Sequence, residues 1–285
     1  MTCEDNGLIE KLSEKLLECE EKLEYRKNDL ETWTDSLEEL SEIKDAFSTD
    51  ENDSLDGKTI LDIGTDCVKP LYIALKFKPK KIIGINEVLS YSYTSDIEQK
   101  SKLFAEETKI KFYNCSLFDK ETLNRILKKE KVKNGLDFVL VSKTLHHLRT
   151  GECKRKRGKK HDCAEVETEK NCIYKFEKEV IFEKLLGLGK RVIVYESFDP
   201  NDIDDDKIRG RGGYFTTKEW MDIFECLSRN YEVVFIRPEP FPLEKQALDK
   251  VEAMLRRVDT ICFYVEEQRV KDAKKPYGTT KQQES

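Results

Sequence analysis

The chain contains no long hydrophobic run. No stretch of its 285 residues approaches the roughly 18 consecutive apolar residues that suggest a transmembrane helix. Its acidic amino terminus also lacks the basic and apolar pattern of a secretory signal peptide. These two absences predict a soluble globular protein, which we expect to be cytoplasmic.

The chain also lacks an excess of positive charge. Charged residues make up 38% of it, but their formal sum at pH 7 is −6. The overall charge therefore does not favour binding to nucleic acid or to an anionic membrane. A partner of that kind would require a local basic patch.

Proline is absent from residues 7–48, which are rich in Glu, Lys and Leu. Their apolar positions recur in alternating steps of three and four, a heptad-like stripe that predicts helix. Asn28 and Glu31 can form a capping box that opens a second helix. We therefore predict a helical amino-terminal extension over residues 1–50, either as a layer packed on the next domain or as a dimerising coiled coil.

Beyond residue 58, strand patterns alternate with helical patterns. The strand patterns fall near residues 59–63, 81–86, 110–114, 136–142, 190–196, 231–237 and 260–266. The helical patterns fall near residues 68–77, 93–107, 120–130, 172–187, 216–228 and 243–256. This alternation predicts an α/β domain over residues 51–267 with a doubly wound sheet, parallel at least at its start. We expect the polar tail, residues 268–285, to be disordered.

The first two predicted strands carry the pattern of a nucleotide-binding βαβ unit. The first ends on Asp62 and Gly64, and the second ends on Asn86 and Glu87, about 20 residues further on. Glycine lets the backbone approach a ligand closely, and the amides that open the next helix can receive an anion. The pattern is imperfect, because Asp66 stands where a second glycine is expected.

Five segments in order resemble the class I, S-adenosylmethionine-dependent methyltransferases. The segments that carry the resemblance are Leu61-Asp62-Ile63-Gly64, then residues 111–119, 136–148, 191–196 and 214–220. The resemblance spans about residues 57–267. It implies a mostly parallel, seven-stranded Rossmann-like sheet and S-adenosylmethionine as the cofactor.

The resemblance also implies which residues contact the cofactor. Asp62 would face the cofactor's ammonium group or order the loop, and Asn86 or Glu87 would hold the ribose hydroxyls. Ser116 would contact the adenine, with Leu117 packed on the ring. The implied cofactor-binding set is Asp62, Gly64, Asn86, Glu87, Ser116 and Leu117.

The candidate catalytic residues follow the fourth and fifth strands. Ser142 and Lys143 end the fourth strand, where the family's transferred methyl group points. His146 is either a general base or a packing residue, and Glu196 ends the fifth strand. The basic, glycine-rich segment 209–214 is either a lid over this edge or a flexible connection.

A basic insertion, residues 151–172, comes just after the segment 136–148 that contains Ser142, Lys143 and His146. Six of the seven residues from 154 to 160 are Lys or Arg. In one interpretation, zinc bound by four residues presents this loop to a phosphate backbone; in the other, the insertion is solvated and disordered. The spacing fits no common zinc signature. The four candidate ligands are Cys153, His161, Cys163 and Cys172.

Together these features predict a methyltransferase that transfers a methyl group to an oxygen or nitrogen nucleophile. The basic loop 154–160 and the segment 209–214 favour RNA, for example transfer RNA, as substrate. The altered positions Asp66, Asn86 and Ser116 support an alternative. In it the chain is a catalytically inactive, methyltransferase-like scaffold, with the amino-terminal helices as a protein-binding surface.

Overall fold

The three-dimensional structure is a computed structural model of the full chain. It describes residues 43, 45–47, 55–65, 68–87, 107–132, 135–145, 178–197, 215, 217–237, 241–243, 248–258 and 260–267. The predicted helix near 93–107 and most of the amino-terminal extension therefore lie outside the described residues. So does the basic insertion.

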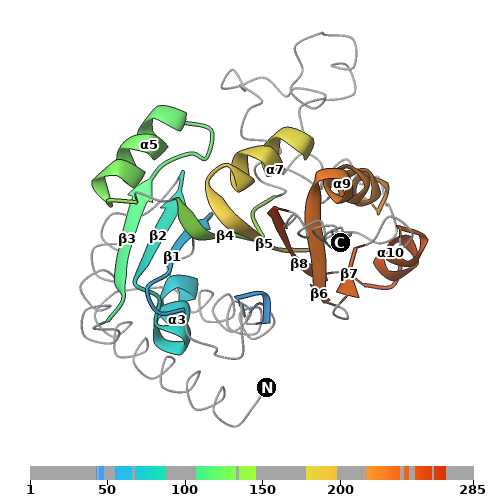
Figure 1. Cartoon of the computed structure of the whole chain (residues 1–285), viewed down its shortest axis with the longest axis horizontal. Helices are drawn as coiled ribbons and strands as arrows, with labels where there is room; N and C mark the ends of the chain where they lie inside the picture. The colour runs from blue at the N-terminus through green and yellow to red at the C-terminus, as the bar shows by residue number, and fades with distance from the viewer. Residues whose placement is uncertain are drawn as a thin grey trace, which may run out of the picture.

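The described residues form one central sheet with helices on both faces (Figure 1). Its strands are β1 (Thr59–Ile63), β2 (Lys81–Asn86), β3 (Lys109–Asn114), β4 (Leu136–Ser142), β5 (Gly189–Ser197), β6 (Tyr231–Arg237), β7 (Phe241–Pro242) and β8 (Thr260–Glu267). Its helices are α3 (Val68–Phe77), α5 (Lys120–Lys129), α7 (Lys178–Leu186), α9 (Thr217–Asn230) and α10 (Leu248–Leu255). Every predicted strand is present, with its ends within one residue of the prediction.

The strands lie in the order β3-β2-β1-β4-β5-β8-β6-β7. The first five strands are parallel to one another, whereas β8 runs antiparallel to both β5 and β6. The order 3-2-1-4-5 is that of a doubly wound α/β fold. The predicted mostly parallel, Rossmann-like fold is therefore confirmed.

The structure adds a short element at the carboxyl-terminal end of the sheet. Beside the seven predicted strands, a two-residue strand, β7, pairs with β6 at the edge. The Leu243 amide donates to the Val233 carbonyl oxygen at 2.7 Å, which keeps residues 241–243 extended. The helix predicted from residue 243 accordingly begins at Leu248.

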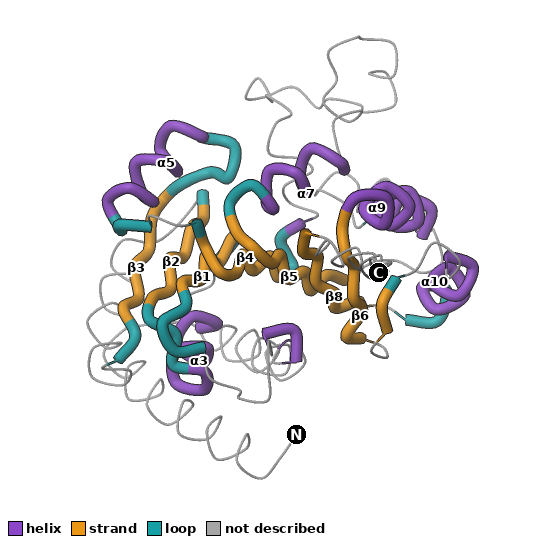
Figure 2. The backbone as a smooth tube through the Cα atoms, in the orientation of Figure 1, coloured by secondary structure: helices purple, strands orange, loops and turns teal. Residues whose placement is uncertain are grey.

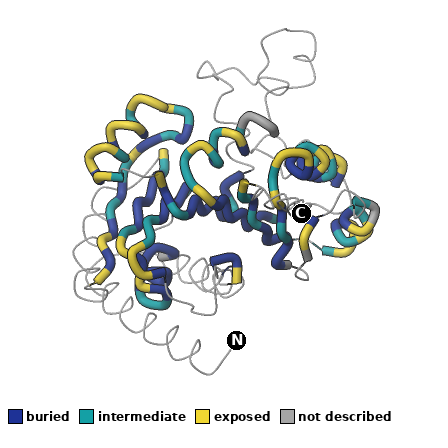
Figure 3. The backbone as a smooth tube through the Cα atoms, viewed as in Figure 1, coloured by how far each residue is buried: buried dark blue, intermediate teal, exposed yellow. Residues whose placement is uncertain are grey.

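Side chains alternate across the strands and build two apolar cores. One core lies under α5, α7, α9 and α10, and we call that side the α5/α9 face. The other lies under α3 and residues 43–47, and we call it the α3 face (Figure 2). The central strands are buried along most of their length because helices cover both sides (Figure 3).

The end of the amino-terminal extension packs on the α3 face. The Phe47 ring contacts the rings of Phe77 and Phe138, each at a centroid distance of 5.5 Å. The Arg191 guanidinium donates to the Ala46 carbonyl oxygen at 3.3 Å. These described residues therefore belong to the same folded unit as the sheet.

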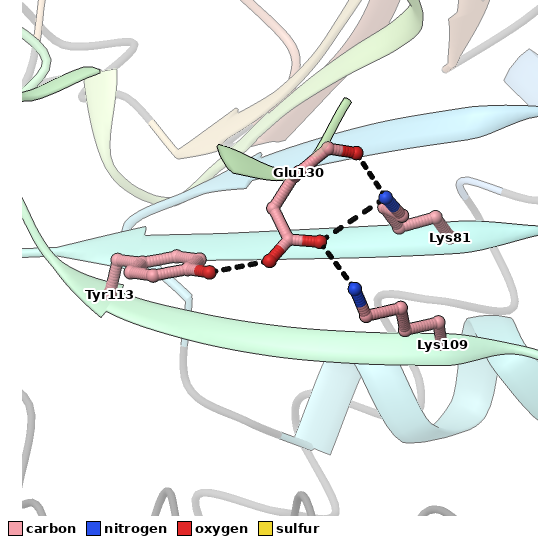
Figure 4. Close-up of polar contacts among 4 residues, drawn as sticks. All are labelled: Lys81, Lys109, Tyr113 and Glu130. Atoms are coloured by element: carbon pink, nitrogen blue, oxygen red, sulfur yellow. Dashed lines mark hydrogen bonds and ion pairs between the residues drawn. The ribbon is translucent and has the colours of Figure 1, made fainter. Parts of the chain in front are cut away.

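An ionic cluster around the buried Glu130 carboxylate joins α5 to β2 and β3 (Figure 4). The Glu130 carboxylate lies 3.2 Å from Lys81 Nζ and 2.7 Å from Lys109 Nζ, and it accepts a 2.6 Å hydrogen bond from the Tyr113 hydroxyl. Lys81 also donates to the Glu130 carbonyl oxygen. Burial alone would raise the pKa of Glu130, but these hydrogen bonds outweigh it and lower the pKa from 4.5 to about 2.

Candidate functional site

The topology places a site where the sheet changes direction. After β1 the chain proceeds to β2 on one side, whereas β4 lies on the other side of β1. In open α/β sheets, ligands bind in the crevice outside the carboxyl ends of the strands at such a switch point. The candidate site is therefore the edge formed by the ends of β1, β2, β3, β4 and β5.

The loop after β1 is tied to the end of β2. The amides of Gly64 and Thr65 both donate to the Ile85 carbonyl oxygen, at 2.8 and 3.2 Å. The Asn86 side-chain amide donates in return to the Thr65 carbonyl oxygen at 3.1 Å. The loop is therefore held by three hydrogen bonds to two consecutive residues of β2.

Gly64 is required by close packing as well as by its backbone conformation. Its φ is +74°, in the left-handed region that favours glycine. A Cβ at this position would lie 2.1 Å from Thr144 Oγ1. Thr144 is fixed there because its hydroxyl donates to the Ser142 carbonyl oxygen at 2.8 Å. The loops after β1 and β4 thus meet across the switch point.

Three predicted site residues lie on one side of the sheet. Alternation along β1, β2 and β4 places Asp62, Asn86 and Ser142 on the α3 face, in line with Ile60, Ile82 and Leu140 of the core beneath α3. Asp62 is 0% exposed and Ser142 is 1% exposed. Ser142 Oγ has no hydrogen-bond partner among the residues that the structure describes.

Glu196 lies on the opposite, α5/α9 face, in line with Val192 and Val194. It is fully buried, and its Oε1 accepts a hydrogen bond from the Ser197 amide at 3.2 Å. The sheet therefore separates this carboxylate from Ser142, although both residues lie near the carboxyl ends of neighbouring strands.

Lys143 follows β4 with a φ of +45°, which is unusual for a residue other than glycine. Its amide donates to the Tyr195 carbonyl oxygen at 2.7 Å, and its Nζ lies 5.8 Å from the centre of the Tyr195 ring. This turn places Thr144 against Gly64. His146, the fourth catalytic candidate, lies outside the described residues, as does Asp66.

The segment after β3 also borders the candidate site. The Ser116 hydroxyl accepts a hydrogen bond from the Phe118 amide at 3.3 Å, so it orders the turn into α5. Leu117 is 2% exposed and belongs to the core of the α5/α9 face. Burial, with smaller contributions from the negative charges of Asp119 and Glu87, raises the pKa of Cys115. The exposed Glu87 carboxylate therefore lies close enough to Cys115 to disfavour a negative charge on its thiol.

Sequence reasoning missed Lys69, in the first turn of α3. It is 4% exposed, which is unusual for a lysine, and α3 covers the face that also buries Asp62. Opposite charges buried in one layer offset part of each other's desolvation. Helical periodicity contained the signal, because Lys69 shares a face with the buried Tyr72 and Ile73 at steps of three and four.

The predicted metal site is not among the described residues, because all four candidate ligands lie outside them. Within the part of the chain that the structure describes, no group of three or more His, Cys, Asp or Glu residues could hold a metal ion. In the same ranges no helix is long and apolar enough to cross a membrane.

Comparisons with known proteins found similar solved structures. No protein-family model and no curated protein sequence matches the chain. Among solved structures, the plantazolicin methyltransferase BpumL, in complex with a monoazolic desmethylPZN analog and SAH, is 12% identical, with a TM-score of 0.46. That similarity covers 93% of this chain and 99% of BpumL.

Two other similar structures are also methyltransferases. The methyltransferase domain of bacterial CtHen1 is 17% identical with a TM-score of 0.42, over 80% of this chain and 96% of that domain. The geranyl diphosphate C-methyltransferase of Streptomyces coelicolor is 9% identical with a TM-score of 0.41. That similarity covers 76% of this chain and 75% of the enzyme. Because these TM-scores lie below 0.5, the strand order and the geometry of the switch point carry the argument that follows.

Proposed function

We propose that this chain, whose sheet has the Rossmann-like methyltransferase fold, is an S-adenosylmethionine-dependent methyltransferase acting on an oxygen or nitrogen nucleophile. The observation that carries the proposal is the set of polar side chains buried at the switch point. Asp62 of β1 and Ser142 of β4 share the α3 face there and are 0% and 1% exposed. Buried acidic and hydroxyl side chains are uncommon in a sheet interior, so their gathering at one sheet edge favours a binding site.

These residues fit the cofactor's chemistry. Asp62 supplies negative charge beneath the β1 loop, which suits a ligand with ammonium and sulfonium groups. Glu87 supplies acceptors for ribose hydroxyls, and Ser116 and Leu117 border the side expected for adenine. Ser142 Oγ adds a buried hydroxyl that has no hydrogen-bond partner among the described residues.

When bound, the cofactor supplies an activated methyl group on its sulfonium. The chain's part in the reaction is mainly to position the nucleophile, because in-line displacement depends on alignment more than on strong acid–base groups. In the proposal, Ser142 and Lys143 orient the incoming oxygen or nitrogen. His146 accepts the proton that the nucleophile releases, because the sheet separates the other candidate, Glu196, from Ser142.

Calorimetric titration with S-adenosylmethionine tests the proposal. We expect micromolar affinity for the full chain, and weakening by about 10-fold or more in Asp62→Asn, since a hydrogen bond to a charged group contributes about 1.5–3 kcal/mol. Asp137→Asn is the matched control, because Asp137 lies at the other end of the parallel strands, where it accepts from the Thr59 amide at 2.9 Å. No binding at millimolar cofactor would overturn the enzyme proposal and leave the scaffold alternative.

We further propose that the substrate is RNA, for example transfer RNA, bound through residues 154–160 and 209–214. Replacing Lys154, Arg155 and Lys156 with alanine should weaken RNA binding and flatten its dependence on salt. The slope of log affinity against log salt should fall by roughly one for each lost phosphate contact.

A second triple variant controls for net charge in the RNA-binding experiment. Lys128, Lys129 and Lys131 lie at the exposed end of α5, and replacing them removes the same total charge. An equal loss of affinity in both triple variants would show non-specific attraction and contradict the proposed RNA site. Transfer of a radiolabelled methyl group to RNA, measured beside binding, tests whether the bound RNA is also the substrate.

A further inference from the structure

We infer that Asn86 is a positioning residue that holds the cofactor loop, and that its amide group, in place of a carboxylate, is essential to that role. The inference rests on the proposed function for its consequence, which is cofactor affinity. Its structural basis is the 3.1 Å hydrogen bond from Asn86 Nδ2 to the Thr65 carbonyl oxygen.

Asn86 connects three strand ends. Its side chain reaches the loop after β1, and its carbonyl oxygen accepts from the Cys115 amide, just after β3, at 3.0 Å. Thr65 is 1% exposed, and its methyl carbon lies 2.9 Å from the position that a Cβ on Gly84 would occupy. The loop after β1 therefore packs tightly on β2 at Gly84, and the Asn86 side-chain amide holds it at Thr65.

An acid cannot replace the amide in this bond. The Thr65 carbonyl oxygen is an acceptor, and an ionised carboxylate has no hydrogen to donate. Aspartate at this position would lose the bond and place negative charge against the carbonyl oxygen. Recognition of ribose hydroxyls then falls to the neighbouring Glu87, which is exposed at the end of the same strand.

The variant Asn86→Asp distinguishes positioning from direct ribose contact by the sign of its effect. If Asn86 mainly contacted ribose, a carboxylate would bind the hydroxyls more strongly and affinity would rise or stay constant. Positioning predicts the opposite, a loss of about 10- to 100-fold in S-adenosylmethionine affinity at pH 8. The difference in S-adenosylmethionine affinity between Asn86→Asp and wild type should become smaller as the pH falls towards about 4. At that pH the new aspartate is partly protonated, and a protonated carboxyl can donate to the Thr65 carbonyl oxygen.

Asn114→Asp is the matched control. Asn114 is the register partner of Asn86 on β3, it is exposed, and the substitution adds the same charge one strand away. We expect it to change affinity by less than about threefold at every pH. Equal affinities for the two variants, or tighter binding by Asn86→Asp, would overturn the inference.

Hydrogen exchange without ligand separates this inference from the proposed function. We expect Asn86→Asp, but not Asn114→Asp, to exchange faster in peptides covering residues 59–65, whose Gly64 and Thr65 amides bond to Ile85. Faster exchange in a protein that binds no cofactor would leave the positioning role standing and reject the proposed function. Unchanged exchange in a protein that binds cofactor would reject the positioning role alone.

Discussion

Replacing Gly64 with alanine is expected to lower the free energy of unfolding by about 3–5 kcal/mol. Part of the loss comes from the φ of +74°, which an L-residue adopts at a cost. The larger part comes from the new Cβ, which would lie 2.1 Å from Thr144 Oγ1. Equilibrium unfolding in urea measures the change, and cofactor binding should be lost with it because the loop must move.

Gly57 offers a matched control for the strained backbone. Its φ is +75°, almost the same as that of Gly64, but no atom of the residues that the structure describes lies within 4 Å of a Cβ placed there. Gly57→Ala should therefore cost only about 1–2 kcal/mol. Similar losses in the two variants would contradict the importance of the contact with Thr144.

A double-mutant cycle tests the same contact from the other side. Thr144→Gly removes the atoms that an alanine at position 64 would meet. We expect Gly64→Ala to cost at least about 1 kcal/mol less in the Thr144→Gly background than in the wild-type chain. Full additivity of the two substitutions would show that the loops after β1 and β4 are not coupled there.

Replacing Glu130 with glutamine is expected to destabilise the protein by about 3.5 kcal/mol at pH 7. The lowering of its pKa from 4.5 to about 2 corresponds to this amount at about 1.4 kcal/mol per pH unit. The variant leaves Lys81 and Lys109 without their shared carboxylate, in a place where the Glu130 side chain is only 3% exposed. Urea unfolding at a series of pH values measures the effect.

The pH dependence of this loss has a definite direction. Because folding lowers the pKa of Glu130, its contribution is complete above pH 4.5, the value for an unperturbed glutamate, and disappears as the pH falls through about 2. Wild type and Glu130→Gln should therefore converge in stability at about pH 2. A difference that stays constant from pH 7 to pH 2 would show that ionisation of Glu130 is not its source.

Glu225 provides a control on the surface of α9. Its carboxylate lies 2.7 Å from Arg229, a distance like that in the Glu130 cluster, but its side chain is 56% exposed. Glu225→Gln should cost less than about 0.5 kcal/mol, because exposed pairs of this kind contribute little. Comparison of the two variants isolates the effect of burial.

The strands of this protein could be predicted closely because their signal is local. Each is a short apolar run bounded by polar residues, and β1, β2, β4 and β6 begin and end where the pattern indicates. The short β7 was missed, since its Phe241-Pro242 has no strand pattern of its own. It forms because β6 offers an open edge, which is a property of the sheet and not of the segment.

The candidate site was only partly predictable. The order of motifs indicated Asp62, Asn86, Ser142 and Glu196, and the structure locates all four at the carboxyl edge of the sheet. Period-2 alternation along the strands separates these residues onto two faces of the sheet. To assign each residue to a face, one must also know which helices cover that face, and the sequence does not give this. The buried Lys69 was missed because lysine in a helix usually lies in solvent.

The amino-acid sequence alone therefore determined the α/β class, the limits of most elements and the order of the motifs along the chain. Periodicity and turn residues act over a few neighbouring positions, and they can be read without any knowledge of distant contacts. The tertiary structure decided the insertion of β8 between β5 and β6, the contact of Thr144 with Gly64, and the hydrogen bond of Asn86 to Thr65. Those contacts join residues from 21 to 80 positions apart, and only packing of the whole sheet brings such residues together.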